Sequence, residues 1–243
     1  MLSDLLGAGF LLLYYLITCF IIPTLLKGWF GAPNELARKF QHVAYALSVF
    51  ILLEMFSSWY IAIAAAFLLV LVAYPVLMVL EKSSFYKKCL TDRTPQGGEL
   101  RKSMLYVQLS FAILIFFVWG LHGAKWQYVV AVAVMAWGFG DAAAALVGKA
   151  CGRHRIIHSL VEGAKTLEGT SAMIVFATLA SFITLLFYVD LSWYLSLLIS
   201  AIVGSACGVV ELFSRRGLDT LTVPLTAAAL TMPLVYVFSL TGW

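Results

Sequence analysis

The chain has 243 residues, of which 63% are hydrophobic and only 12% are charged, and its formal net charge is +4. Because about a quarter of the residues of a soluble globular domain are charged, this composition excludes an ordinary soluble protein. The small positive charge is ordinary for a membrane protein, and we expect no nucleic-acid partner.

Apolar residues form blocks of about twenty, the length that crosses about 30 Å of hydrocarbon. A transmembrane β-barrel would show shorter segments of alternating hydrophobicity instead. We predict eight transmembrane helices, over residues 3–25, 36–54, 58–80, 103–121, 127–149, 167–188, 193–213 and 219–240. Since no loop is long enough to fold alone, we expect an all-α, polytopic integral membrane protein with residues 1–243 as a single transmembrane domain.

Basic residues gather in alternate loops of this pattern. Of the 16 Lys and Arg residues, only Lys125 belongs to the opposite set of loops. By the positive-inside rule the basic loops are cytoplasmic, which makes both termini non-cytoplasmic. Trp59, Trp126 and Trp193 lie at predicted outer ends, where amphipathic rings favour the headgroup region.

Three polar residues enter the second span from the cytoplasmic side. Arg38 and Lys39 precede His42 by four and three residues, so all three share one helical face. Arg38 and Lys39 also fit as topogenic charges paired with Glu35, and His42 fits as a hydrogen-bonded packing residue. The sequence leaves both interpretations open.

The longest loop, residues 81–102, is polar and basic and contains the turn-forming run Thr91–Gly98. This composition is typical of a solvated topogenic loop near anionic headgroups. The alternative is a lid over a polyanionic substrate.

Asp141 places a carboxylate inside the fifth span. It lies eight residues before the predicted cytoplasmic end, which is about 12 Å at 1.5 Å per residue. A charge at this depth costs a few kcal/mol and usually has a function, although a purely structural role is the alternative. Gly140 and Gly148 lie beside it, but Gly148-Lys149-Ala150 is not a Walker A loop, because neither Ser nor Thr follows the lysine.

Further charges lie at the cytoplasmic ends of the last three spans. Lys165, Thr166, Glu168, Gly169 and Thr170 lead into the sixth span. Each charge also has a simpler interpretation: Lys165 and Glu168 mark a helix start.

Glu211 ends the seventh span and Asp219 begins the eighth. Glu211 can pair with Arg215 four residues later, and Asp219 can cap its helix. Taken together, however, these residues bring cations and carboxylates from several spans to one membrane face. A nucleoside triphosphate needs cations for its phosphates and carboxylates for Mg²⁺, which Asp141 and Glu168 would supply.

Four short elements of the chain resemble the motifs of one enzyme family. Arg38-Lys39-Phe40-Gln41-His42 resembles R-K-x-x-H, and Gly140–Gly152 resembles G-D-x-x-A-x-x-x-G-x-x-x-G. Lys165–Thr170 resembles K-T-x-E-G-T, and Asp219–Leu225 resembles D-N-L-x-x-P-L, with Thr220 in place of the usual asparagine. These are motifs of the CTP-dependent lipid-alcohol kinases, the family of dolichol kinase, phytol kinase and CTP-dependent diacylglycerol kinase.

This resemblance implies a catalytic domain that transfers the γ-phosphate of CTP, with Mg²⁺, to the hydroxyl of an isoprenoid alcohol or diacylglycerol. The active site would face the cytoplasm from the plasma membrane or an endomembrane. The residues expected to contact CTP are Arg38, Lys39, Gly140, Gly148, Lys165, Thr166, Glu168, Gly169 and Thr170.

The resemblance also implies roles. Asp141, Glu168 and Glu211 would bind the metal, and Lys165, Arg38 and Lys39 would neutralise charge on the transferring group. The predicted catalytic residues are Asp141, Asp219, His42 and Lys165. Asp219 or His42 would accept the proton of the lipid hydroxyl.

Two alternatives stay open. A phosphatidate cytidylyltransferase-like enzyme would also use CTP on a lipid. An ion- or proton-coupled transporter would use Asp141 as a relay, but internal repeats are absent from the sequence. Small residues on the later spans would permit a homodimer, and the 4 cysteines are expected to be unpaired thiols.

Overall fold

A computed structural model describes residues 2–29, 31–83, 98–163, 165–215 and 217–240. Within these ranges all regular elements are helices, apart from one isolated bridge between Arg155 and Thr166. Eight helices in the described residues are long and apolar enough to cross a membrane. This confirms the all-α class and the integral membrane character. The orientation of the termini stays a prediction.

The chain forms two compact units, Met1–Phe116 and Phe117–Trp243. The expectation of one transmembrane catalytic domain stays a prediction. The ends of the predicted spans agree with the observed helices to within four residues. Most of the 81–102 loop, including Cys89, lies outside the described residues, so its predicted roles are untested.

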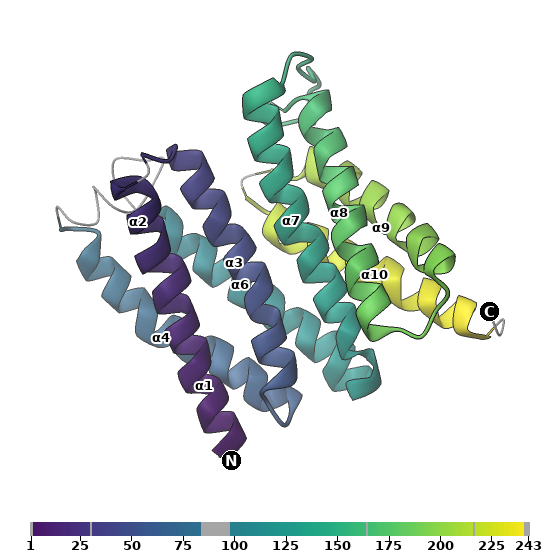
Figure 1. The fold of residues 1–243 in the computed structure, drawn as a ribbon, viewed down its shortest axis with the longest axis horizontal. Coiled ribbons are helices and arrows are strands. Elements are labelled where there is room, and N and C mark those ends of the chain that lie inside the picture. Colours follow the sequence, from purple (N-terminus) through teal and green to yellow (C-terminus); the bar gives the residue numbers. More distant parts are fainter. Residues whose placement is uncertain (1, 30, 84–97, 164, 216, 241–243) are drawn as a thin grey trace. The chain divides into compact units, whose positions relative to one another are not determined.

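The first unit contains four membrane-length helical segments (Figure 1). The first consists of α1 (Leu2–Tyr15), the π-helical η1 (Leu16–Ile21) and α2 (Ile22–Gly28). It is followed by α3 (Asn34–Glu54), α4 (Trp59–Leu80) and α6 (Glu99–Leu114). The π-helical continuation of α6, η2 (Ile115–Gly120), crosses the boundary between the two units in the chain.

Buried polar side chains connect the helices of this unit. The Tyr15 hydroxyl lies 2.6 Å from the Ser48 hydroxyl and accepts a 2.8 Å hydrogen bond from the amide of Gln108. The amide of Gln41 donates to the carbonyl of Cys19 at 2.8 Å. Since hydrocarbon offers no partners for polar groups, these bonds both satisfy the side chains and fix the contacts of α1 and η1 with α3 and α6.

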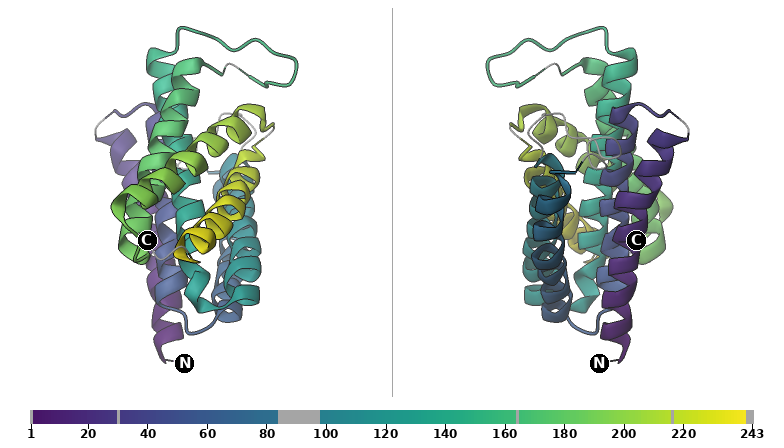
Figure 2. Two further views of the ribbon diagram at one scale, coloured as in Figure 1. Left: turned by 90° about the vertical axis from the view of Figure 1, so that its right-hand side faces the viewer. Right: turned by 90° about the vertical axis from the view of Figure 1, so that its left-hand side faces the viewer.

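The second unit begins with a short 3₁₀ turn, Ala124–Trp126, followed by α7 (Gln127–Cys151). It continues with α8 (Leu167–Tyr188), α9 (Trp193–Phe213) and α10 (Asp219–Leu240). α8 packs against α7 and α9, and α10 packs against α9 and α7 (Figure 2). The loop 152–166 extends beyond the ends of α7 and α8 in the same view.

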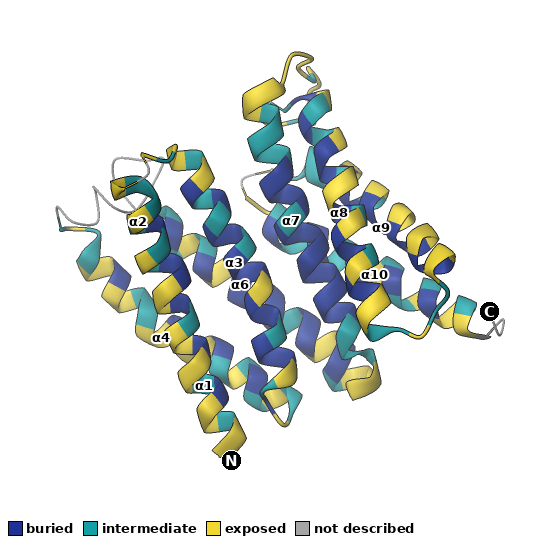
Figure 3. Ribbon diagram, viewed as in Figure 1, coloured by how far each residue is buried: buried dark blue, intermediate teal, exposed yellow. Residues whose placement is uncertain are grey.

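Burial separates the core from the lipid-facing surface (Figure 3). α7 is buried along most of its length, and the run Val129–Val134 is 0% exposed. Other helices keep apolar residues on the outside, such as Leu71, which is 72% exposed, and Phe187, which is 83% exposed. In a bilayer, such faces contact hydrocarbon, as expected for membrane spans.

Glycines set the spacing of the helices in the second unit. A Cβ on Gly204 would lie 2.8 Å from the backbone nitrogen of Thr178, and a Cβ on Gly208 would lie 2.4 Å from Cγ1 of Ile174. Only the absence of a side chain allows α9 to lie this close to α8. These two glycines therefore allow close packing of α8 and α9 within the unit.

Candidate functional site

Asp141 lies in the buried part of α7 and is 6% exposed. The helix continues to Cys151, two residues further than predicted, so Asp141 precedes its end by ten residues, or about 15 Å. The neighbouring Gly140 faces α8, because an added Cβ there would meet Met173 and Ala177. A carboxylate at this depth is costly, which favours a functional role.

Lys165 connects two segments that lie far apart in the sequence. Its ammonium lies 2.9 Å from Oε1 of Glu211 and also donates to the backbone carbonyl of Glu211. The carbonyl of Ser214 lies 3.5 Å from the same ammonium. Lys165, just before the start of α8, is thereby held at the C-terminal end of α9. The unpaired backbone carbonyls at that helix end favour a cation.

This arrangement corrects one expectation about Glu211. The sequence suggested a helical pair with Arg215, but α9 ends at Phe213, so Arg215 is not on the same helix. Its guanidinium instead donates to the carbonyls of Ser159 at 2.8 Å and Leu160 at 3.2 Å. The loop 152–166 is therefore attached to the α9–α10 turn at two places.

Thr166 is the N-cap of α8. Its hydroxyl accepts a hydrogen bond from the backbone of Gly169 at 3.1 Å, which satisfies one unpaired donor of the first turn. A Cβ on Gly148 would lie 3.2 Å from the same hydroxyl, and a Cβ on Gly169 would lie 2.9 Å from the carbonyl of Ala144. At Gly148 and Gly169, α7 and the first turn of α8 therefore lie in close contact. The contacts of these residues with CTP stay predictions.

Glu168 contacts the loop that precedes α8. Its Oε1 lies 2.7 Å from Nδ1 of His154, and the backbone nitrogen of His154 lies 3.3 Å from both carboxylate oxygens. Hydrogen bonds from Ile156 to Lys165 and from Leu167 to His154 close the base of this loop. His154 was not among the predicted site residues. Its contact with the first turn of α8 depends on the path of the loop, and residue spacing in the sequence does not reveal that path.

The predicted metal ligands Asp141, Glu168 and Glu211 come from three different helices. In the described part of the chain, no three His, Cys, Asp or Glu side chains gather into a metal-binding cluster. Mg²⁺ typically takes one or two protein carboxylates and completes its octahedron with phosphate oxygens and water. A buried carboxylate such as Asp141 fits an ion held mainly by a nucleotide, and the assignment of all three ligands stays a prediction.

Asp219 is the first residue of α10 and is half-buried. The turn between α9 and α10 contains Gly217 at φ +79°, a conformation that favours glycine. The hydroxyls of Ser214 and Thr222 lie 2.7 Å apart across this turn. Thr220, which replaces the asparagine of the family motif, is buried. The turn thus places Asp219 at the same end of the unit as Glu211.

The remaining predicted residues belong to the first unit. Arg38 forms an ion pair with Glu35 and lies 3.8 Å from the carboxylate of Glu99 on α6. The interpretation of Arg38 as a partner of Glu35 is therefore correct. Lys39 and His42 are 3% and 9% exposed, and they lie three residues apart on the buried face of α3. A lysine buried at a helix end is costly and needs partners.

No family model matches the chain, and no solved structure matches it. The chain is 31% identical over 207 residues to a phytol kinase from Synechocystis sp., and the aligned region covers 81% of this chain and 78% of the relative. This similarity extends far beyond the four short motifs. The chain belongs to the family of CTP-dependent lipid-alcohol kinases.

Proposed function

We propose that this kinase transfers the γ-phosphoryl group of CTP to the hydroxyl of an isoprenoid alcohol of the phytol or polyprenol type, or of diacylglycerol. Membership of the family supports the kinase class. The basic loops support a site at the cytoplasmic face, because Lys and Arg beside transmembrane spans remain on that side.

The observation that carries this proposal is the contact between Lys165 and Glu211. It joins the K-T-x-E-G-T element to the acid that precedes the Asp219 element. The ammonium of Lys165 lies at the C-terminal end of α9, and the N-terminus of α8 begins two residues after Lys165 in the chain. Cations and helix N-termini both attract phosphate. Because the ammonium has three donors and is already bound to Glu211, a phosphate oxygen would replace one of its protein acceptors.

Asp141 would hold Mg²⁺ through a carboxylate oxygen, and Glu168 and Glu211 are the other candidate ligands. The chemistry that a bound Mg²⁺ would supply there is neutralisation of the charge that develops during transfer. To reach the ion, Glu211 would have to release Lys165, and Glu168 would have to release His154. This competition favours Asp141 as the principal ligand.

In the reaction, the lipid hydroxyl oxygen would form a bond to the γ-phosphorus while the bond from that phosphorus to the β-phosphate oxygen breaks and CDP leaves. Lys165, Arg38 and Lys39 would neutralise the transferring group. The hydroxyl proton would pass to Asp219 or His42, whose carboxylate and imidazole are suitable bases. Phosphoryl transfer depends mainly on such positioning and charge.

The proposal is tested by giving the purified protein CTP or ATP together with phytol, farnesol, polyprenol or diacylglycerol, each in phospholipid vesicles. We expect a phosphorylated lipid with CTP and slower transfer with ATP. Products that form equally fast with both nucleotides would contradict the CTP assignment. A protein that phosphorylates no lipid alcohol but takes up ions into proteoliposomes without nucleotide would contradict the proposed activity.

A further inference from the structure

Arg215 connects two segments of the second unit that lie far apart in the sequence. It lies in the turn between α9 and α10, four residues before Asp219. Its Nε donates to the carbonyl of Leu160 at 3.2 Å, and its Nη2 donates to the carbonyl of Ser159 at 2.8 Å. Both acceptors belong to the loop that leads to Lys165. Neither the phosphoryl transfer nor the metal binding proposed above involves Arg215.

The base of this loop is held by backbone pairing. The nitrogen of Ile156 donates to the carbonyl of Lys165 at 2.9 Å, and an isolated bridge pairs Arg155 with Thr166. Lys165 and Thr166 therefore move together with the loop. The tip of the loop, residues 157–163, extends beyond this pairing, past the ends of α7 and α8 (Figure 2).

The tip has little packing of its own. None of the residues 157–163 is buried, and Ile157 is 95% exposed. The imidazole of His158 meets the ring of Phe213 edge-on, with 6.4 Å between the ring centroids. Because a segment without a buried apolar core gains little from packing, directed contacts such as those of Arg215 determine how well its position is fixed.

The guanidinium of Arg215 suits this contact. Its donors are fixed in one plane, so two of them can bind the carbonyls of consecutive residues at once. Hydrogen bonds from a charged donor are stronger than those from a neutral one. Arg215 is itself exposed, so its replacement leaves neither a cavity nor a buried charge. The contact can therefore fix the loop without being required for the fold.

We propose that Arg215 is a positioning residue that holds this loop in the conformation that binds the nucleotide. The inference rests on the proposed function, in which Lys165 and Thr166 contact CTP. With Arg215 the loop is ordered before CTP binds. Without Arg215 only a fraction of the molecules has the binding conformation, and the apparent affinity for CTP falls by that fraction. Bound CTP orders the loop in either case, so the rate of transfer is preserved.

The first test measures the kinetics of Arg215→Ala. We expect the KM for CTP to rise about tenfold, while kcat and the KM for the lipid alcohol stay close to the wild-type values. Lys149→Ala is the matched control, because Lys149 is exposed in the last turn of α7 and carries the same charge. Equal KM values for CTP in the two variants, or a loss confined to kcat, would overturn the proposal.

The second test observes the loop without nucleotide or catalysis. A nitroxide spin label is attached to Ile157→Cys in a variant whose 4 natural cysteines are replaced by alanine. We expect a broad spectrum of a restrained label with Arg215 and narrow lines of a mobile label with Arg215→Ala. A label on the natural Cys151, exposed at the end of α7, is the control and should give the same spectrum in both.

Equal spectra of the Ile157→Cys label with and without Arg215 would overturn the proposal, even if the KM for CTP rises, because Arg215 would then act by contacting CTP itself. A label that becomes mobile in Arg215→Ala, in a protein that phosphorylates no lipid alcohol, would instead refute the proposed function alone.

Discussion

Lys165 is held by the side chain and the carbonyl of Glu211, which fixes its charge at the end of α9. If this ammonium stabilises the transferring phosphoryl group, Lys165→Ala should lower kcat about 100-fold. Lys125→Ala is the control, because Lys125 lies on the opposite set of loops and contacts the ring of Trp126. The measurement is kcat at saturating CTP and lipid. Equal kcat values for both variants would remove Lys165 from the mechanism.

Asp141→Asn separates a functional from a structural carboxylate. The substitution keeps the size and shape of the side chain and a hydrogen-bonding group, so the protein should stay folded with an unfolding temperature close to that of the wild type. The turnover should fall about 100-fold or more, because the amide is a poor Mg²⁺ ligand. Asp190→Asn, at an exposed position after α8, should change neither quantity. A lower unfolding temperature that accounts for the lost activity would indicate a structural carboxylate.

At the scale of single residues, the sequence indicates which residues are candidates for the site more readily than it indicates which residues they contact. Asp141 and Lys165 could be selected because charges are rare in and beside membrane spans. The partner of Glu211 could not, because a pair spaced by four residues requires a continuous helix and α9 ends before Arg215. The contact of His154 with Glu168 depends on the path of a loop, which hydropathy does not encode.

At the scale of elements, glycines determine how closely α9 approaches α8. A Cβ on Gly204 would lie 2.9 Å from the carbonyl of Ile174 as well as close to the backbone of Thr178. Backbone atoms cannot move aside alone, so Gly204→Ala should destabilise the protein by about 1–3 kcal/mol. Gly9→Ala is the control, since nothing lies within 4 Å of a Cβ there. The measurement is the unfolding midpoint in detergent, and equal midpoints would contradict tight packing.

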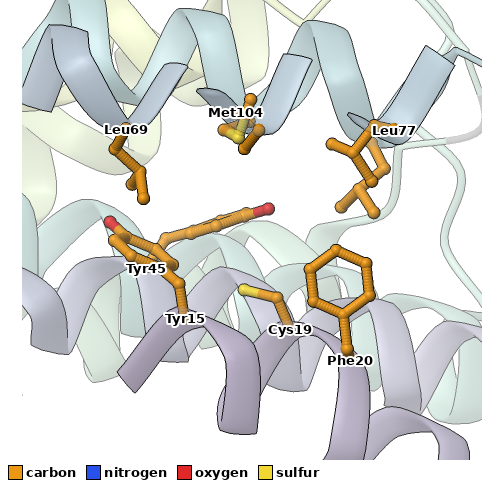
Figure 4. Close-up of a pocket in the computed structure, with 9 residues that line it drawn as sticks. Tyr15, Cys19, Phe20, Tyr45, Leu69, Leu77 and Met104 are labelled. Atoms are coloured by element: carbon orange, nitrogen blue, oxygen red, sulfur yellow. The ribbon is translucent and has the colours of Figure 1, made fainter. Parts of the chain in front are cut away.

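The helices themselves follow from the sequence because the thickness of the bilayer sets the length of an apolar block. The hydropathy pattern did not predict the π-helical segments Leu16–Ile21 and Ile115–Gly120. A π-helix differs from an α-helix in its backbone hydrogen bonds. Because this difference does not change the hydropathy of the segment, a π-helix cannot be recognised within a run of apolar residues. One of these segments, η1, lines a small apolar cavity of the first unit (Figure 4).

At the scale of the whole molecule, the alternation of basic loops predicts the orientation in the membrane. Cys151, exposed at the end of α7, should react with a membrane-impermeant maleimide only from the cytoplasmic side. The measurement uses vesicles of both orientations and a variant in which Cys19, Cys89 and Cys207 are replaced by Ala. Lys125→Cys in the same background, with Cys151 also replaced, should react only from the other side. Labelling of both positions from one side would refute the orientation.

The fold class and the family could be recognised from the sequence because both depend on features that are local in the chain. Apolar blocks define the spans, and four short motifs from Arg38 to Leu225 define the family. The small apolar cavity of the first unit could not be predicted, because its wall combines residues of η1, α1, α3, α4 and α6 that share no sequence pattern. Such a site arises only from the packing of helices.

The most direct test of the central claim follows both ends of the nucleotide in one reaction. CTP labelled with one isotope in the γ-phosphate and another in the cytidine is incubated with the wild-type protein, Mg²⁺ and the preferred lipid alcohol. The account predicts that the γ-label appears in the lipid while the cytidine label leaves as CDP. Cytidine label in the lipid, with release of pyrophosphate, would contradict it and identify a cytidylyltransferase.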